Sequence, residues 1–195
     1  MLIGSPACKG FSTWQALNVA KAKDPEAMRR AKIGAIVHLD FVASLYEDQA
    51  EGGRYFLHEH PLNATSWEVP SIERVLSRGD VERVHGDQCQ YGASVSHGPL
   101  KGSPVKKPTG FMTNALRVAR ALEARCSGLG GSCSRAGGGS HATCSGRIAR
   151  EAAIYPKELC RAMLKGIRDQ LREDGALKNG CYGIQAQDDD QIDAT

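Results

Sequence analysis

The chain contains no apolar run long enough to cross a membrane. Its longest apolar stretch, residues 33–45, is interrupted by His38, Asp40 and Ser44, whereas a membrane helix needs about 20 consecutive apolar residues. Residues 1–6 carry neither a basic leader nor an apolar core of signal-peptide length. We therefore expect an intracellular protein, nuclear or cytoplasmic, with no membrane partner.

Acidic residues are few in most of the chain and concentrated near its end. Residues 188–193 carry four aspartates and no base, whereas residues 1–187 carry 25 Lys and Arg against 18 Asp and Glu. This surplus of bases indicates a polyanion partner, with a solvated, mildly basic surface as the alternative. At 195 residues and 41% hydrophobic content, we expect one domain over residues 1–172 and an acidic, disordered tail over 173–195.

The seven cysteines are an odd number, and in a reducing compartment they serve as nucleophiles, metal ligands or core residues more often than as disulfides. Cys126, Cys133 and Cys144 cluster around His141, whereas the others stand apart: Cys8, Cys89, Cys160 and Cys181. Three sulfurs and one imidazole are the ligand set of a structural zinc site. The sequence therefore predicts a zinc loop inserted at residues 126–146, with a flexible Gly- and Ser-rich loop as the alternative.

Hydrophobic periodicity predicts an α/β domain in which helices alternate with strands. The expected helices span residues 13–23, 24–46, 66–77, 114–125 and 156–171, and the expected strands end near Ile3 or span 54–59, 81–89 and 109–113. This alternation indicates a three-layer parallel sheet, in which ligands bind at the carboxyl ends of the strands. In the second helix, Ile33, Val37, Phe41 and Leu45 form one apolar stripe, and Ile36, Leu39 and Val42 widen it. We therefore expect that helix to be covered on more than one side.

Two residues at that edge form a candidate catalytic pair. Cys8 follows the first strand in a loop with Gly and Pro, and Glu59 ends the next strand. A thiolate attacks an electron-poor ring more readily when a nearby acid engages the ring nitrogen. Cys8 and Glu59 fit those roles.

The order of these motifs resembles that of the DNA (cytosine-5) methyltransferases. The segment Gly4-Ser5-Pro6-Ala7-Cys8-Lys9-Gly10-Phe11-Ser12 is similar to their catalytic loop, although Ala7 separates the proline from the cysteine. Phe56-Leu57-His58-Glu59 is similar to their glutamate strand, and Arg147-Ile148-Ala149-Arg150-Glu151-Ala152-Ala153-Ile154-Tyr155-Pro156 to a later family segment. Lys106 and Lys107 stand where the family has arginines. The same blocks resemble copies embedded in mobile-element polyproteins of protists.

The resemblance implies a fold, a cofactor and a mechanism. The fold is a Rossmann-like methyltransferase sheet that is incomplete at its N-terminus, because the glycine-rich loop for S-adenosylmethionine would lie before Met1 and an upstream segment would supply it. Cys8 would attack the ring of a cytosine flipped out of DNA, Glu59 would engage the ring nitrogen, and methyl transfer and elimination would follow. Lys106, Lys107 and Ser12 would contact the DNA.

Two alternatives to methyl transfer remain. The first is a non-catalytic, zinc-stapled module that binds DNA or RNA and derives from a mobile element. The second is a cysteine hydrolase that uses Cys8 with His58 or His60, although no nucleophile-elbow or protease context surrounds Cys8.

Overall fold

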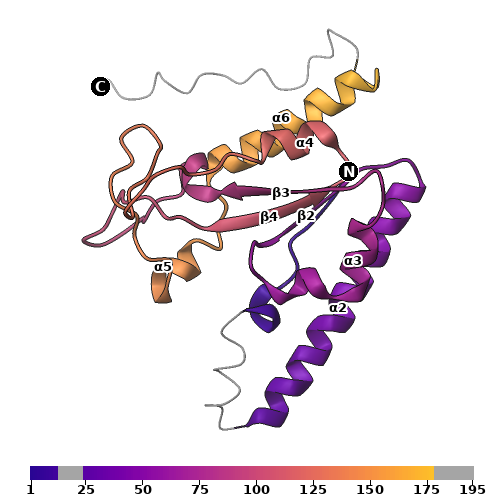
Figure 1. Ribbon diagram of the computed structural model, residues 1–195, viewed down its shortest axis with the longest axis horizontal. Helices are drawn as coiled ribbons and strands as arrows, with labels where there is room; N and C mark the ends of the chain where they lie inside the picture. Colours follow the sequence, from indigo (N-terminus) through magenta and orange to yellow (C-terminus); the bar gives the residue numbers. More distant parts are fainter. Residues whose placement is uncertain (13–23, 178–195) are drawn as a thin grey trace, which may run out of the picture.

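The computed structural model describes residues 1–12 and 24–177 (Figure 1). The expected helix at 13–23, Cys181 and nearly all of the expected tail lie outside the described residues. The strands are β1 (Leu2–Gly4), β2 (Phe56–Pro61), β3 (Glu82–Asp87) and β4 (Pro108–Thr113). The α-helices are α2 (Pro25–Glu51), α3 (Pro70–Leu76), α4 (Leu116–Ala121), α5 (Gly146–Glu151) and α6 (Lys157–Glu173), with single 3₁₀ turns η1 (Cys8–Phe11), η2 (Thr65–Glu68) and η3 (Gln88–Tyr91).

The four strands form one mixed sheet in the order β1-β2-β4-β3. β1 pairs with β2 in parallel, whereas β4 is antiparallel to both β2 and β3. The expectation of an all-parallel sheet is therefore wrong. The physical reason is the connection from β3 to β4. A strand that follows another in parallel needs a crossover connection, usually a helix, whereas this connection contains only η3 and irregular loop.

Helices cover both faces of the sheet, which confirms the α/β class in its general form (Figure 1). On one face, α2 and α3 enclose a core centred on Leu39, Tyr46 and Met112. On the other face, α4 and α6 enclose a second core that includes Phe111 and Leu159. β1, β2 and β3 point the same way, since β2 and β3 both oppose β4 and β1 follows β2. Their carboxyl ends therefore share one edge.

The long helix α2 starts where the sequence predicts and is covered on one side. Asp24 caps it by accepting a hydrogen bond from the Ala27 amide at 2.8 Å. Leu39 is fully buried, whereas Val37 is 62% exposed and Phe41 is 59% exposed. The expected cover on a second side is thus not found among the described residues. No helix in the described part of the chain has the length and apolarity to span a membrane.

The segment after α4 departs most from the sequence-based expectation. A helix was expected to reach residue 125, but α4 ends at Ala121. Beyond it, the chain crosses the end of β3, where the Asp87 amide donates to the Ala124 carbonyl at 2.9 Å. The Asp87 carboxylate accepts from the Cys126 amide at 2.8 Å. These contacts with β3 replace the last helical turn and bring Cys126 to the same sheet edge as the end of β3.

Candidate metal centre and the cysteine loop

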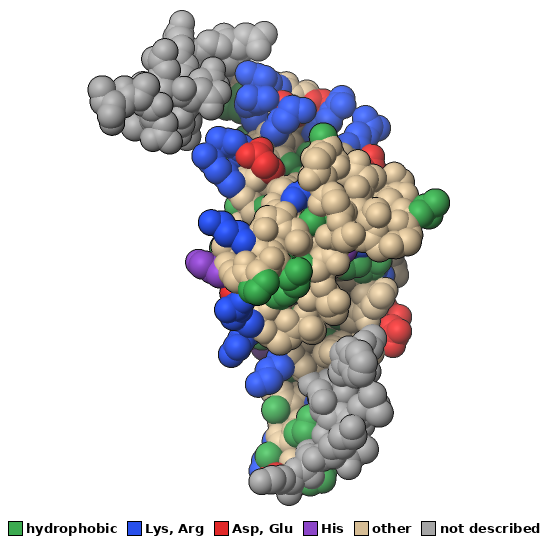
Figure 2. All heavy atoms as spheres, turned by 90° about the vertical axis from the view of Figure 1, so that its left-hand side faces the viewer, with side chains coloured by type: hydrophobic (Ala, Val, Ile, Leu, Met, Phe, Trp, Pro, Cys, Tyr) green, Lys and Arg blue, Asp and Glu red, His purple; other side chains and the backbone are tan. Residues whose placement is uncertain are grey.

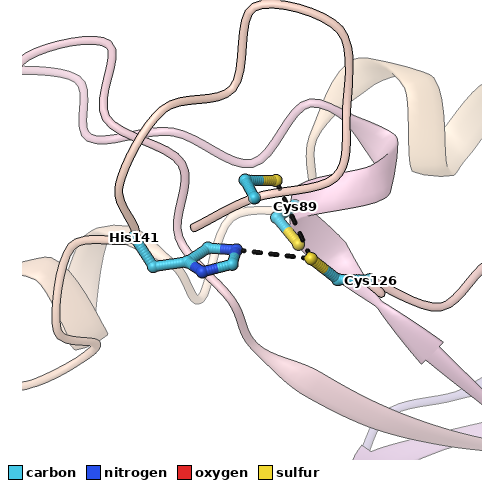
Figure 3. Close-up of side chains that lie close together, drawn as sticks. Cys89, Cys126 and His141 are labelled. Atoms are coloured by element: carbon cyan, nitrogen blue, oxygen red, sulfur yellow. Dashed lines mark hydrogen bonds between the residues drawn. The ribbon is translucent and has the colours of Figure 1, made fainter. Parts of the chain in front are cut away.

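Three cysteines and one histidine converge beyond the end of β3. Cys89 lies in η3, Cys126 follows α4, and Cys133 and His141 lie on the loop that follows (Figure 3). Their ligand atoms all lie within 4.8 Å of one another. Segments that are distant in the sequence therefore supply one compact Cys₃His group.

Two distances within the group are close to those of a tetrahedral metal site. The Sγ atoms of Cys126 and Cys133 are 4.0 Å apart, and Cys126 Sγ lies 3.6 Å from His141 Nε2. With Zn–S near 2.3 Å and Zn–N near 2.0 Å, a tetrahedron places two sulfurs about 3.8 Å apart and a sulfur and a nitrogen about 3.5 Å apart. This cluster could therefore hold a metal such as zinc without a large rearrangement.

Surrounding groups orient these ligands. The Nδ1 atom of His141 lies 2.9 Å from the Gly131 carbonyl oxygen, and donation to that oxygen leaves Nε2 free to ligate. The Gln90 side-chain amide lies 3.6 Å from Cys89 Sγ and 3.7 Å from Cys133 Sγ. The Gly131 carbonyl also accepts from the His141 amide at 2.7 Å. Hydrogen bonds to its own backbone thus hold this Gly- and Ser-rich loop in place.

The pKa values of Cys126 and Cys89 are shifted in opposite directions. Burial acts to raise the pKa of Cys126, but hydrogen bonds from the Ser134 and Gly128 amides and from the Ser134 hydroxyl outweigh it and lower the pKa to about 6. Burial, together with the neighbouring Cys133 and Cys126, raises the pKa of Cys89 to about 12. Cys126 is therefore the cysteine best prepared to act as a thiolate ligand.

The structure changes one member of the expected ligand set. Cys126, Cys133 and His141 come together as expected, but the fourth ligand is Cys89, and Cys144 lies outside the group. Cys144 instead packs against the small core that contains Val105. Cys89 is distant in sequence from the other three, and its only signal was its position just after a strand that ends at the shared sheet edge.

Charged residues tie the metal loop to the sheet. Asp87 is 1% exposed and accepts from the Cys126 amide, while His85 Nε2 lies 3.1 Å from the other carboxylate oxygen. Lys106 Nζ lies 3.7 Å from Asp87 and 3.5 Å from the Cys126 carbonyl. Lys106, expected at the DNA, therefore helps to hold Cys126 in place.

The loop that carries Cys8 is anchored on β2. The Ser5 hydroxyl donates to Glu59 Oε2 at 2.7 Å, and the Pro6 carbonyl lies 3.1 Å from His60 Nε2. Cys8 follows as the first residue of η1 and is exposed, and Ser12 comes directly after that turn. The structure thus joins the Cys8 loop to Glu59 through Ser5 and leaves the thiol at the surface.

Glu59 is buried beside two further polar side chains. The residue is 4% exposed, and Lys107 Nζ lies 3.9 Å from Oε1 and 3.2 Å from the Ala152 carbonyl. Burial and the nearby Glu59 carboxylate raise the pKa of Tyr155. Among the described residues, neither Glu59 Oε1 nor the Tyr155 hydroxyl has a hydrogen-bond partner. The cluster therefore has unused hydrogen-bonding capacity, and Lys107 faces inward to it.

The two histidines of β2 lie on the opposite face from Glu59, within the α2 core. His60 is fully buried, with Nδ1 2.5 Å from the Ser66 hydroxyl and Nε2 beside the Pro6 carbonyl. His58 is also fully buried, with Nδ1 2.9 Å from the Tyr46 hydroxyl. Both ring nitrogens of His60 and one of His58 are thus occupied, so neither histidine is arranged as a general base for Cys8.

No family model matches this chain, and neither the curated proteins nor the solved structures contain a match to it.

Proposed function

We propose that this chain is a DNA (cytosine-5) methyltransferase-like domain whose Cys8 loop and Glu59 act on a cytosine ring. The observation that carries the proposal is the 2.7 Å hydrogen bond from Ser5 to Glu59. It fixes the start of the cysteine loop to the buried carboxylate, and Cys8 follows three residues later. A nucleophile in the loop after β1 and an acid on the neighbouring parallel strand β2 are the kind of pair that addition to an aromatic ring requires.

The addition step uses residues of this chain alone. The Cys8 thiol passes its proton through water to the Glu59 carboxylate, and the thiolate bonds to ring carbon C6. The electron pair of the C5–C6 double bond moves onto C5 while Glu59 donates a hydrogen bond to the ring nitrogen, which replaces the bond from Ser5. C5 then takes a proton from water, and the reverse steps restore the base and the thiolate. Addition therefore exchanges the hydrogen on C5 with water.

S-adenosylmethionine has no fitting site among the described residues, and no step of the proposal passes through it. The glycine run Gly128–Gly131 belongs to the metal loop, where a Cβ on Gly128 would lie 2.0 Å from the Ser132 carbonyl. The close approach at Gly128 serves the turn of this loop, and the run does not join a strand to a helix as a cofactor-binding glycine loop does. A Rossmann-like methyltransferase sheet would need an upstream segment to complete it.

Exchange at C5 tests the proposal without a methyl donor. The full chain is incubated with DNA that carries tritium at C5 of cytosine, and tritium released to water is measured. We expect release by the native chain, none above background with Cys8→Ser, and a loss of about 10²-fold with Glu59→Gln. Cys160→Ser removes another exposed cysteine and should leave release unchanged. Absence of release by the native chain, or equal release by Cys8→Ser, would refute addition by Cys8.

A second candidate function is a non-catalytic nucleic-acid-binding module held together by zinc. The Cys₃His cluster favours it, because its distances and its oriented imidazole suit tetrahedral zinc. Zinc would join η3 to the segment after α4 and to the loop that follows, and so stabilise that end of the molecule. Elemental analysis of the purified chain should find about one zinc per molecule. Metal-free protein with an unchanged unfolding temperature would exclude this structural role.

A further inference from the structure

The outward face of α6 carries a row of positive side chains. Leu159, Met163, Gly166 and Gln170 are buried against the core. The basic residues of the helix are all exposed and follow a spacing of three or four residues: Lys157, Arg161, Lys165, Arg168 and Arg172. At 100° per residue this spacing places them on the side opposite the buried residues, over about 22 Å of helix. We call these five residues the α6 stripe.

The stripe lies where positive charge gathers on the molecular surface. Figure 2 shows Lys and Arg side chains at the upper end of the molecule, where Figure 1 places α4 and α6, and further ones down the left margin of that face. Within the stripe, Lys157 and Arg172 have no ion pair among the described residues. The other members pair only with exposed or half-exposed acids, such as Arg161 with Glu158 at 2.6 Å. Such surface pairs contribute little and are readily replaced.

The lysines first expected at nucleic acid are otherwise engaged. Lys106 contacts Asp87 and the Cys126 carbonyl, and Lys107 contacts Glu59 and the Ala152 carbonyl. Phosphate contacts by this chain must therefore come from another basic surface. Bases that recur every four residues lie about 6 Å apart along a helix, a regular spacing suited to an extended row of phosphates.

We infer that the α6 stripe binds the phosphate backbone of a nucleic-acid duplex. The inference builds on the proposed nucleic-acid function, but needs neither Cys8 chemistry nor zinc. Its partner is a DNA duplex, the nucleic acid of the proposed function. Each contacted phosphate releases condensed counterions, so affinity falls with salt at a slope of about 0.9 per contact for B-DNA.

The salt dependence of binding tests the stripe. Fluorescence anisotropy with a labelled mixed-sequence DNA duplex is measured between 50 and 200 mM NaCl for the native chain and for K157Q/K165Q/R172Q. Glutamine keeps the helix propensity. Loss of three phosphate contacts should reduce the slope by about 2.7, so that the native chain loses about 40-fold more affinity than the variant over this range.

A matched control removes equal charge elsewhere. R29Q/R30Q/R74Q neutralises three exposed arginines on α2 and α3 and should retain the native slope. An unchanged slope in the α6 variant, or an equal reduction in both variants, would overturn the inference. Tighter binding of an RNA duplex of the same sequence than of the DNA duplex would overturn DNA as the partner of the stripe. The salt slope is measured separately from tritium release, so failure of ring addition and failure of the stripe give different results.

Discussion

At the scale of the residue, Gly86 in β3 is fixed by a close backbone approach. A Cβ at this position would lie 2.3 Å from the Leu122 carbonyl oxygen and 3.2 Å from the Phe111 ring. The carbonyl belongs to the segment that leads to Cys126, so it cannot move aside without shifting that ligand. Gly86→Ala should destabilise the chain by about 1–3 kcal/mol, the usual cost of overpacking, as measured by urea unfolding. Gly79→Ala, where a Cβ meets nothing within 4 Å, should have no such cost, and equal stability of the two variants would contradict this account.

The sequence predicted single residues best where local pattern fixes their position. Cys8 lies just beyond the carboxyl end of β1, as expected, whereas Glu59, expected to end its strand, lies two residues before the end of β2. Cys89 was missed as a ligand because its three partners are far along the chain, and only the fold brings them within reach. Lys106 and Lys107 were expected at a partner, but their inward contacts depend on side chains from other segments, which no local pattern encodes.

At the scale of the element, α2 has one buried side and one exposed side, and one substitution on each side can measure how much each contributes to stability. Leu39 is fully buried in the core with Tyr46, whereas Val37, two residues earlier, is 62% exposed. Leu39→Ala should lower the free energy of unfolding by about 2–5 kcal/mol, because it removes buried methyl groups and leaves a cavity. Val37→Ala should change it by less than about 0.5 kcal/mol. A comparable loss in both variants, measured by urea unfolding, would mean that another surface covers the outer side of α2.

The metal loop gives a second test at this scale. Cys89→Ser removes a sulfur of the cluster, whereas Cys144→Ser removes one that packs elsewhere. We expect Cys89→Ser to lose stoichiometric zinc and to unfold at a lower temperature, since a structural metal contributes directly to folding. Cys144→Ser should keep about one zinc per chain. Elemental analysis and thermal unfolding of both proteins measure this difference, and the reverse pattern would restore Cys144 as a ligand.

At the scale of the whole molecule, the sequence predicted where the strands lie better than how they pair in the sheet. Strands expected at 54–59, 81–89 and 109–113 occur at Phe56–Pro61, Glu82–Asp87 and Pro108–Thr113. The direction of β4 was not predicted, because alternation of apolar residues marks a strand without saying which neighbour it pairs with. β4 inserts between β2 and β3, and this pairing is decided by the length and content of the loop before it.

Burial of neutral histidines between the sheet and α2 should make the stability of the whole molecule depend on pH. Burial, with repulsion from His60 and Arg83, lowers the pKa of His58 from 6.5 to about 3. Burial also lowers the pKa of His60. Below pH 6.5 the unfolded chain therefore binds protons that the folded chain excludes, so stability is full above pH 6.5 and is lost as the pH falls toward 3. The loss for His58 approaches about 1.4 kcal/mol per pH unit.

Urea unfolding at pH 7.5, 6.5 and 5.5 measures this loss, and His58→Gln isolates its source. The amide can still accept a hydrogen bond from Tyr46 but does not titrate, so this variant should lose less stability between pH 7.5 and 5.5 than the native chain. Any effect of pH on the metal cluster is common to both proteins and cancels in the comparison. His38→Gln, on the exposed side of α2, should retain the native pH dependence. If the native chain and His58→Gln lose the same stability, His58 is not held neutral by the core, and the acid sensitivity has another origin.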